Sequence, residues 1–244
     1  MNDNDSVKID AEFEMIDTER YARNLMLEEF DASSQLRLQE SAVCIVGAGA
    51  LGSVVAMYLA GAGVGKLRIA DFDTVAISNL QRQVFFTERE IGMPKCEMLR
   101  DRIVNLNSNA TVECFTSAVN TDNICEFTSG CDVVVECTDK IATKAMLVDA
   151  VGKVGLPIVL GGVREFQGQL CVFTGDSTVG YTDMFPVQPD TVLAPPGVFS
   201  PVPGIVGSLQ AAEVLKLLTG IGRPLKDMLL NFDVRTMTFQ KFEF

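Results

Sequence analysis

The 244-residue sequence contains no histidine. Histidine is the side chain that most often acts as a general acid or base near neutral pH, and it is the commonest metal ligand in proteins. Any catalysis by this chain must therefore use arginine, lysine, aspartate, asparagine or cysteine side chains.

Basic residues are scarce relative to acidic ones. The chain has 20 lysine and arginine residues against 32 aspartate and glutamate residues, which gives a formal net charge of −12 and an isoelectric point near 4.5. Proteins that bind nucleic-acid phosphates usually present a basic face. We therefore expect no nucleic-acid partner.

Paired cysteine motifs and long apolar runs are also missing. The seven cysteines include no Cys-x-x-Cys pair and lie mostly in apolar, strand-like segments, as is typical of reduced thiols in the cytoplasm. No apolar run approaches the ~20 residues of a membrane span, and the acidic N-terminus has no signal-like stretch. We expect a cytoplasmic protein with no membrane partner and a mobile acidic tail over residues 1–16.

What the sequence does contain is a regular alternation of strand-like and helical segments. Its length and its hydrophobic content of 48% fit one α/β domain over residues 17–244 that begins with helical stretches. Strands are predicted at 42–46, 66–70, 111–115, 132–136 and 157–160, and helices at 51–59, 93–106 and 141–154. This alternation predicts a Rossmann-like, doubly wound and mostly parallel sheet with helices on both faces.

The pattern changes after Gly168. A strand is predicted at 169–174, and the stretch 175–203 then holds six of the nine prolines, which predicts an extended crossing loop and no helix. A helix is predicted at 205–218, followed by two further strands at 228–233 and 236–242. We expect these C-terminal strands to be antiparallel.

A glycine turn follows the first predicted strand. Gly47, Gly49, Ala50 and Gly52 lead from this strand into a helix, a geometry that directs backbone N–H groups and a helix N-terminus at a phosphate. Asp71 lies at the end of the second strand, where a carboxylate binds ribose hydroxyls. Up to this point an NAD-binding domain fits equally well.

Charged side chains beyond the second strand point to a different nucleotide chemistry. They are Asp71, Asp73, Arg82, Lys95 and Asp139. Because the carboxyl ends of the strands share one edge of a doubly wound sheet, these side chains can converge over the glycine turn. Two cations and a Mg²⁺-binding carboxylate around a triphosphate suit attack at phosphorus, and hydride transfer requires none of them. Taken singly, Arg82 or Lys95 would be interpreted as a surface cation, and only their joint placement after acidic strand ends favours a functional role.

Several motifs together make the sequence similar to the ThiF/MoeB/HesA family. They are the glycine turn, Asp-Phe-Asp at 71–73, Ser-Asn-Leu-Gln-Arg-Gln at 78–83, Gly-Met-Pro-Lys at 92–95, Cys-Thr-Asp at 137–139, Gly-Gln-Leu at 168–170 and Gly-Ser-Leu-Gln-Ala-Ala-Glu at 207–213. Members of this family are bacterial relatives of ubiquitin-activating enzymes. With ATP and Mg²⁺ they adenylate the C-terminal Gly-Gly carboxylate of a ubiquitin-like sulfur carrier, and they release pyrophosphate. The resemblance therefore implies a single adenylation domain over 17–244, acting in thiamine or molybdopterin biosynthesis.

The resemblance also implies roles for individual residues. The nucleotide-binding set comprises Gly47, Gly49, Ala50, Gly52, Asp71, Asp73, Asn79, Arg82, Lys95 and Asp139. Within it, Asp71 would bind ribose, the side chains at positions 79, 82 and 95 would hold the phosphates, and Asp139 would bind Mg²⁺. Arg23 matches an arginine that reaches the nucleotide of the neighbouring subunit, which implies a homodimer. From the residues alone, Arg23 would be an exposed helix arginine.

Two departures from the family pattern limit the expected chemistry. Where many members have Cys-x-x-Cys for structural zinc, this chain has residues 180–183, and it ends at Phe244 without a second pair. A closed zinc site requires four ligands, so we expect no zinc. Leu193 stands where some members have a cysteine that links covalently to the carrier. We therefore expect the reaction to stop at the acyl-adenylate, with Cys137 and Cys171 as core residues.

Three alternative functions stay open. The superfamily also includes an ATP-dependent dehydratase that modifies a tRNA base, although the acidic charge of this chain disfavours tRNA binding. A non-catalytic nucleotide-binding scaffold is a second alternative, and it would have no physical reason to retain charges opposite a triphosphate. An NAD-dependent oxidoreductase is the third. The sequence does not identify the carrier or the sulfur donor.

Overall fold

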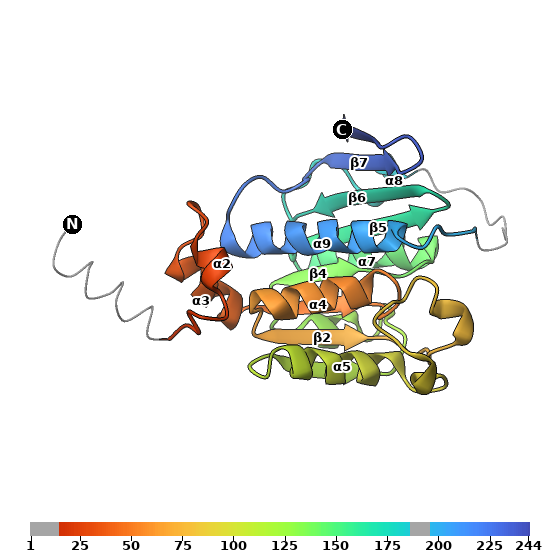
Figure 1. Ribbon diagram of the computed structural model, residues 1–244. Helices are drawn as coiled ribbons and strands as arrows, with labels where there is room; N and C mark the ends of the chain where they lie inside the picture. Colours follow the sequence, from red (N-terminus) through yellow and green to blue (C-terminus); the bar gives the residue numbers. More distant parts are fainter. Residues whose placement is uncertain (1–14, 186–195) are drawn as a thin grey trace.

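An eight-stranded sheet, in the order β3-β2-β1-β4-β5-β6-β7-β8, forms the centre of the computed structural model (Figure 1). The structure describes residues 15–185 and 196–244, so most of the predicted acidic tail lies outside the described residues. The strands are β1 (Ala42–Val46), β2 (Lys66–Ala70), β3 (Thr111–Phe115), β4 (Val133–Glu136), β5 (Ile158–Arg164), β6 (Gln167–Phe173), β7 (Met228–Asp233) and β8 (Thr238–Glu243). Strands β1 to β5 pair in parallel and β5 to β8 pair antiparallel. The predicted fold class is confirmed.

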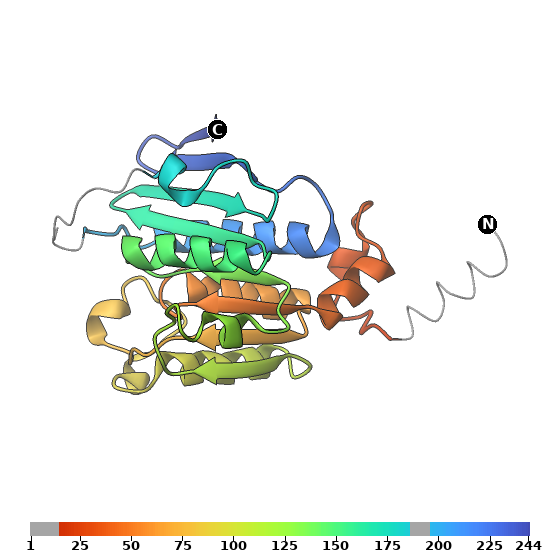
Figure 2. The same ribbon diagram turned by 180° about the vertical axis from the view of Figure 1, so that it is seen from behind.

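Helices cover both faces of the sheet. The face turned toward the viewer in Figure 1 carries α4 (Gly52–Ala62), α5 (Lys95–Leu106) and α9 (Val202–Thr219). The opposite face, seen in Figure 2, carries α6 (Ile124–Thr128), α7 (Ile141–Lys153) and α8 (Tyr181–Met184). Each face has its own cluster of buried apolar side chains. None of the helices in the described part of the chain is both long and apolar enough to cross a membrane.

The buried strands have the composition that burial on both faces requires. All five residues of β1 and all four residues of β4 are buried, and both strands are nearly continuous apolar runs. These two strands are neighbours, with Val46 opposite Glu136 at their carboxyl ends. The chain leaves β1 toward β2 and leaves β4 toward β5, so the strand order reverses between them. Open α/β sheets bind ligands outside the strand ends at such a switch point.

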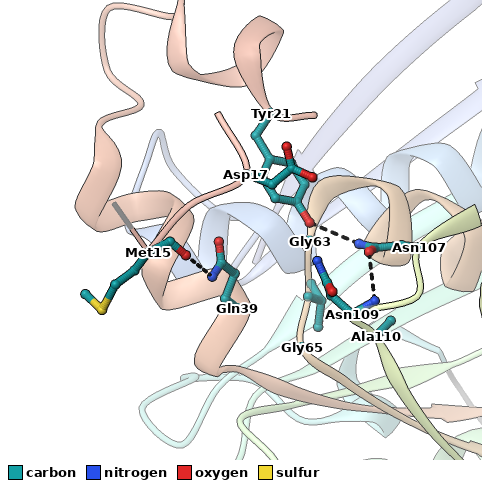
Figure 3. Close-up of a pocket in the computed structure, with 10 residues that line it drawn as sticks. Met15, Asp17, Tyr21, Gln39, Gly63, Gly65, Asn107, Asn109 and Ala110 are labelled. Atoms are coloured by element: carbon teal, nitrogen blue, oxygen red, sulfur yellow. Dashed lines mark hydrogen bonds between the residues drawn. The ribbon is translucent and has the colours of Figure 1, made fainter. Parts of the chain in front are cut away.

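The helices α2 (Ala22–Leu25) and α3 (Ala32–Glu40) lie at the other end of the sheet, where the parallel strands begin (Figure 1). Polar contacts hold this N-terminal segment around a cavity of about 350 Å³ (Figure 3). The Tyr21 hydroxyl accepts a hydrogen bond from Asn107 Nδ2 at 3.0 Å. Gly63, at a φ of +95°, leaves room for these contacts, because a Cβ there would lie 2.7 Å from the Tyr21 ring. This cavity is therefore at the opposite end of the strands from the glycine turn.

The start of α9 differs from the expectation for a proline-rich stretch. The stretch 175–203 was predicted to contain no helix, yet α9 begins at Val202. Pro201 and Pro203 do not prevent this, because the first amides of a helix have no intrahelical acceptor and proline's missing N–H costs nothing there. Residues 186–195, with Leu193, lie outside the described residues.

Two short helices were not predicted. Helix α8 forms inside the proline-rich stretch, and its Tyr181 is buried with its ring 4.9 Å from that of Phe185. Helix α6 forms between β3 and β4, where Ile124 and Phe127 are buried. Elements of four or five residues give no readable periodicity, so burial of apolar side chains decides their conformation.

Candidate functional site

The glycine turn after β1 lies at the switch point and packs directly against the segment after β4. Gly47 has a φ of +99°, and its N–H donates to Ala70 O at 2.8 Å. A Cβ on Gly47 would lie 2.9 Å from Cys137 O, and one on Gly52 would lie 1.8 Å from Gly47 O. Neither position can hold a side chain without moving backbone, which explains both glycines.

Backbone amides of the turn are available for a ligand. In the described residues, the N–H groups of residues 49–52 donate to no protein acceptor. They belong to the N-terminus of α4, an 11-residue helix whose first amides carry partial positive charge. Such an array of free N–H groups binds phosphate.

Carboxylates at the end of β2 hold this turn in place. Asp71 accepts the N–H of Ala48 at 2.6 Å through Oδ2 and the N–H of Asp73 at 2.8 Å through Oδ1. Burial raises the pKa of Asp71, and these two hydrogen bonds and the charge of Lys95 act against that rise. Lys95 Nζ lies 3.0 Å from Asp73 Oδ2, and the lysine side chain is only 6% exposed. The site thus contains a nearly buried cation at the first residue of α5.

Gln83 was not predicted as a site residue, although it is the last residue of the Ser-Asn-Leu-Gln-Arg-Gln motif at 78–83. Its side chain is buried, and Nε2 lies 3.4 Å from the position of a Cβ on Gly49. Its Oε1 has no hydrogen-bond partner among the described residues. A buried polar atom without a partner is costly, and a bound ligand can satisfy it.

The side chains of Asn79 and Arg82 form hydrogen bonds with backbone groups of nearby residues. Asn79 Oδ1 accepts the N–H of Ala76 at 3.2 Å within the 3₁₀ helix η1 (Ile77–Asn79), and Arg82 Nη1 donates to Ser78 O at 3.0 Å. The structure places both on the connection that carries Gln83. Their contact with phosphate remains a prediction.

The loop after β4 lies beside the glycine turn at the switch point, and the region outside these strand ends is called the crevice. Glu136 is fully buried and accepts the N–H of Thr138 at 2.7 Å. Asp139 follows, is exposed, and makes no hydrogen bond or ion pair with the described residues. Residues 15–185 and 196–244 contain no cluster of three or more acidic or cysteine side chains able to hold a metal. A lone free carboxylate fits Mg²⁺, which is usually held by one or two carboxylates together with water and substrate phosphates.

Comparison with known proteins decides the family. The sequence pattern of the ThiF family matches residues 21–244. The chain belongs to the ThiF family. It is 37% identical over 232 residues to the sulfur carrier protein adenylyltransferase of Thermus thermophilus, covering 91% of this chain and 86% of that protein. It is 39% identical over 229 residues to the adenylyltransferase and sulfurtransferase MOCS3 of Drosophila grimshawi, covering 92% of this chain and 51% of that protein. The ThiF-family chain thus spans about half the length of its MOCS3 relatives.

Solved structures share the fold of this ThiF-family chain. Escherichia coli MccB with MccA-N7isoASN superposes with a TM-score of 0.84 at 21% identity, over 93% of this chain and 72% of that chain. PaaA superposes with a TM-score of 0.79 at 22% identity, over 93% of this chain and 73% of that chain. At these identities the likeness concerns the fold alone.

One predicted site residue of this ThiF-family chain lies elsewhere. Arg23 is exposed on α2, at the end of the sheet where the parallel strands begin, whereas the glycine turn lies at their carboxyl ends (Figure 1). Strand β1 alone separates these ends by ~16 Å, given a rise of ~3.3 Å per residue. Arg23 therefore does not join the other predicted residues within one chain.

The cysteines of this ThiF-family chain form no disulfide. Cys137 and Cys171 are both buried, as predicted for core residues. Burial raises the pKa of Cys171 to about 12 and raises the pKa of Cys137 as well. A thiol with a raised pKa is a poor nucleophile because the thiolate is the reactive form.

Proposed function

We propose that this chain is an ATP-dependent adenylyltransferase that activates the C-terminal Gly-Gly carboxylate of a ubiquitin-like sulfur-carrier protein. The observation that carries the proposal is the set of free amides at residues 49–52, together with Lys95 at the start of α5 and Asp139 on the loop after β4. An anion-binding helix N-terminus flanked by a buried cation and a free carboxylate suits a Mg²⁺-bound triphosphate. The Thermus relative, which this chain matches over most of both lengths, is named for the same activity.

In the proposed reaction, a carboxylate oxygen of the carrier attacks the α-phosphorus of ATP. An O–P bond forms, the bond to pyrophosphate breaks, and the product is an acyl-adenylate. The free amides of the glycine turn hold phosphate oxygens, and Asp71 accepts hydrogen bonds from the ribose. Lys95 and Arg82 neutralise the charge that develops around phosphorus. Asp139 would hold Mg²⁺, which neutralises phosphate charge when bound.

The proposal includes a homodimer in which Arg23 completes the site of the partner subunit. Its support is the distance of α2 from the glycine turn of its own chain. Large apolar side chains on the β2–α5 connection, each more than 40% exposed, provide a surface that a second chain can cover. They are Phe72, Ile77, Val84, Ile91 and Met93. A cytoplasmic location, sulfur delivery by another protein, and a role in thiamine or molybdopterin synthesis are further parts of the proposal.

Carrier-dependent exchange of labelled pyrophosphate into ATP tests this function. The protein is incubated with ATP, Mg²⁺ and a panel of small proteins that end in Gly-Gly. Exchange should require one of these carriers, and Asp139→Ala should lower it by about 100-fold or more, the range for loss of one transition-state contact. Asp149→Ala, which removes an exposed carboxylate from α7, is the matched control and should leave exchange unchanged.

Exchange with no carrier of the panel would contradict the proposal. Binding of tRNA at low salt without such exchange would favour the dehydratase. Unchanged exchange in Asp139→Ala would show that this carboxylate has no part in the reaction.

A further inference from the structure

A buried carboxylate, Glu136, lies at the end of the central strand β4 and has no role in the proposed reaction. It is fully buried, with Val46 of β1 on one side and Leu160 of β5 on the other. Asp71, the first residue after β2, lies close to the same sheet edge and holds the glycine turn through the N–H of Ala48. A half-buried carboxylate, Asp71, and a fully buried one, Glu136, therefore lie at the bases of the loops that follow β2 and β4.

The contacts of Glu136 connect the loop that carries Asp139 to the helices α7 and α9. One carboxylate oxygen accepts both the N–H and the hydroxyl of Thr138, and the other accepts from Lys144 Nζ. Lys144 Nζ also donates to Gly161 O on β5 at 2.7 Å. Gln210 Nε2 on α9 donates to the backbone oxygen of Glu136 at 2.8 Å. Every polar atom of the pair has a partner.

Stability alone does not account for this arrangement. A buried ion pair gains little over apolar side chains of the same size, because desolvation of the two charges cancels most of their attraction. The Glu136–Lys144 pair does, however, fix the geometry of the loop that follows β4. Thr138 is held one residue before Asp139, and Lys144 holds α7, which begins two residues after Asp139.

We propose that Glu136 and Lys144 are positioning residues that clamp the loop 137–140 and so fix the Asp139 carboxylate over the crevice. The inference rests on the proposed function in one respect, namely that Asp139 binds the Mg²⁺ of a bound nucleoside triphosphate. The clamp itself follows from the contacts of Glu136, Thr138 and Lys144. Loss of a group that orients a metal ligand typically lowers metal affinity or activity by about 10- to 100-fold.

Three variants and one control test the clamp. Glu136→Gln and Lys144→Met each remove one charge, and Lys144→Arg keeps it. Lys153→Met is the matched control, because Lys153 lies on the same helix in an exposed pair with Asp149. Binding of α,β-methylene-ATP is measured by calorimetry at a series of Mg²⁺ concentrations, and exchange of the Thr138 amide is followed by NMR.

The half-saturating Mg²⁺ concentration should rise about 10- to 100-fold in Glu136→Gln and Lys144→Met, the usual effect of losing such a supporting contact. Protection of the Thr138 amide should fall in the same two variants. Lys144→Arg should recover most of both properties, and Lys153→Met should match the wild type. Because Lys144→Arg retains the charge, it keeps the test meaningful if either other variant does not fold.

Two results would overturn the proposal. One is lower thermal stability with an unchanged Mg²⁺ requirement, which would show a purely structural pair. The other is an unchanged Thr138 amide in Glu136→Gln, which would show that there is no clamp. If the wild type binds no nucleotide, the proposed function fails, and loss of Thr138 protection still supports the clamp.

Discussion

Gly52 and Gly49 belong to the same turn but have different neighbours. Because of this difference, we expect substitution of Gly52 to affect folding and substitution of Gly49 to affect ligand binding. A Cβ on Gly52 would lie 1.8 Å from the backbone oxygen of Gly47, whereas a Cβ on Gly49 would first meet the flexible Gln83 amide at 3.4 Å. Backbone cannot yield to a contact of 1.8 Å, and a side-chain amide can yield by a few tenths of an ångström. Of Gly49 and Gly52, the fold therefore requires glycine only at position 52.

We predict that Gly52→Ala lowers the free energy of unfolding by about 3 kcal/mol or more, as severe overpacking does. Gly49→Ala should change it by less than about 1 kcal/mol, because the added methyl meets only a side chain. The methyl of Gly49→Ala would nevertheless project beside the free amides and weaken binding of α,β-methylene-ATP. Urea unfolding and calorimetry measure the two effects. Wild-type nucleotide affinity in Gly49→Ala would contradict the placement of phosphate on this turn.

The sequence predicts those site residues whose role depends on backbone geometry. Gly47, Gly52 and Asp71 were predicted because a strand-turn-helix with an acidic second strand imposes them, and the structure brings them together. Glu136 and Gln83 could not be assigned roles in the same way. Their importance comes from burial and from partners on other elements, and no local pattern encodes those.

At the scale of the elements, an ion pair between Glu90 and Arg102 joins the connection between β2 and α5 to the helix α5. Glu90 ends the 3₁₀ helix η2 (Glu88–Glu90), and Arg102 of α5 donates to both of its carboxylate oxygens, at 2.7 Å and 2.8 Å. Burial acts to raise the pKa of Glu90, but the hydrogen bonds from Arg102 and from Thr87 N–H outweigh it. The pKa of Glu90 therefore lies below its ordinary value of 4.5.

We predict that Glu90→Gln lowers the free energy of unfolding at pH 7 by about 1 to 2 kcal/mol, the usual worth of a hydrogen-bonded charge. A carboxyl whose pKa is lower in the folded state contributes stability above its unfolded pKa and loses it as the pH falls. The difference between wild type and variant should therefore shrink as the pH falls below 4.5. Urea unfolding across this range measures it. Glu88→Gln, at an exposed position of the same helix, is the control, and a gap that stays constant with pH would refute the linkage.

Helix α8 shows how an element is stabilised where no metal is expected. Tyr181 is buried against the face of the sheet that also carries α6 and α7, and burial raises the pKa of its hydroxyl to about 12. On the same stretch, Thr178 donates to Asp227 through both its N–H and its hydroxyl at 3.2 Å. Apolar packing and these hydrogen bonds connect the stretch before α8 to the start of β7.

We predict that Tyr181→Ala lowers the free energy of unfolding by about 3 kcal/mol, as large-to-small core substitutions do. Tyr58→Ala, at a side chain that is 57% exposed, should change it by less than about 0.5 kcal/mol. Incubation with EDTA should leave the melting temperature of the wild type unchanged, because the packing needs no metal. A melting temperature that falls by several degrees with EDTA would contradict the prediction that the chain binds no zinc.

The elements that were predicted best are the buried parallel strands and the longer helices. β1 and β2 both match their predicted bounds. For β1 the reason is that an apolar run buried on both faces of a sheet has a clear start and end. The predictions for 175–203 were less accurate, since proline content indicates irregular chain and does not exclude a helix that begins at proline. Chain topology was predictable because β-α-β crossovers are right-handed and neighbouring strands pair.

At the scale of the whole molecule, the two ends of the sheet carry different features. The amino ends of the parallel strands carry α2, α3 and the cavity of Figure 3, and their carboxyl ends carry the glycine turn, Lys95 and Asp139. If Arg23 contributes to catalysis, it must act on a site in another chain. Because Arg23 would act only on another chain, the proposed dimer can be tested by measuring activity as well as molecular mass.

We predict that two inactive variants restore activity when they are co-expressed with different affinity tags and purified together. Arg23→Ala keeps its own crevice intact but cannot complete the partner's, and Lys95→Met has a defective crevice but still offers Arg23. A mixed dimer then contains one complete site, formed by the crevice of the first chain and Arg23 of the second. Purification through both tags in turn selects the mixed dimers, each with one complete site of two, so exchange activity should reach about one half of the wild-type value. Carrier-dependent pyrophosphate exchange measures this recovery, with each variant alone as the baseline. Full activity in Arg23→Ala alone, or no recovery in mixed dimers that both tags confirm, would rule out a site shared between two chains.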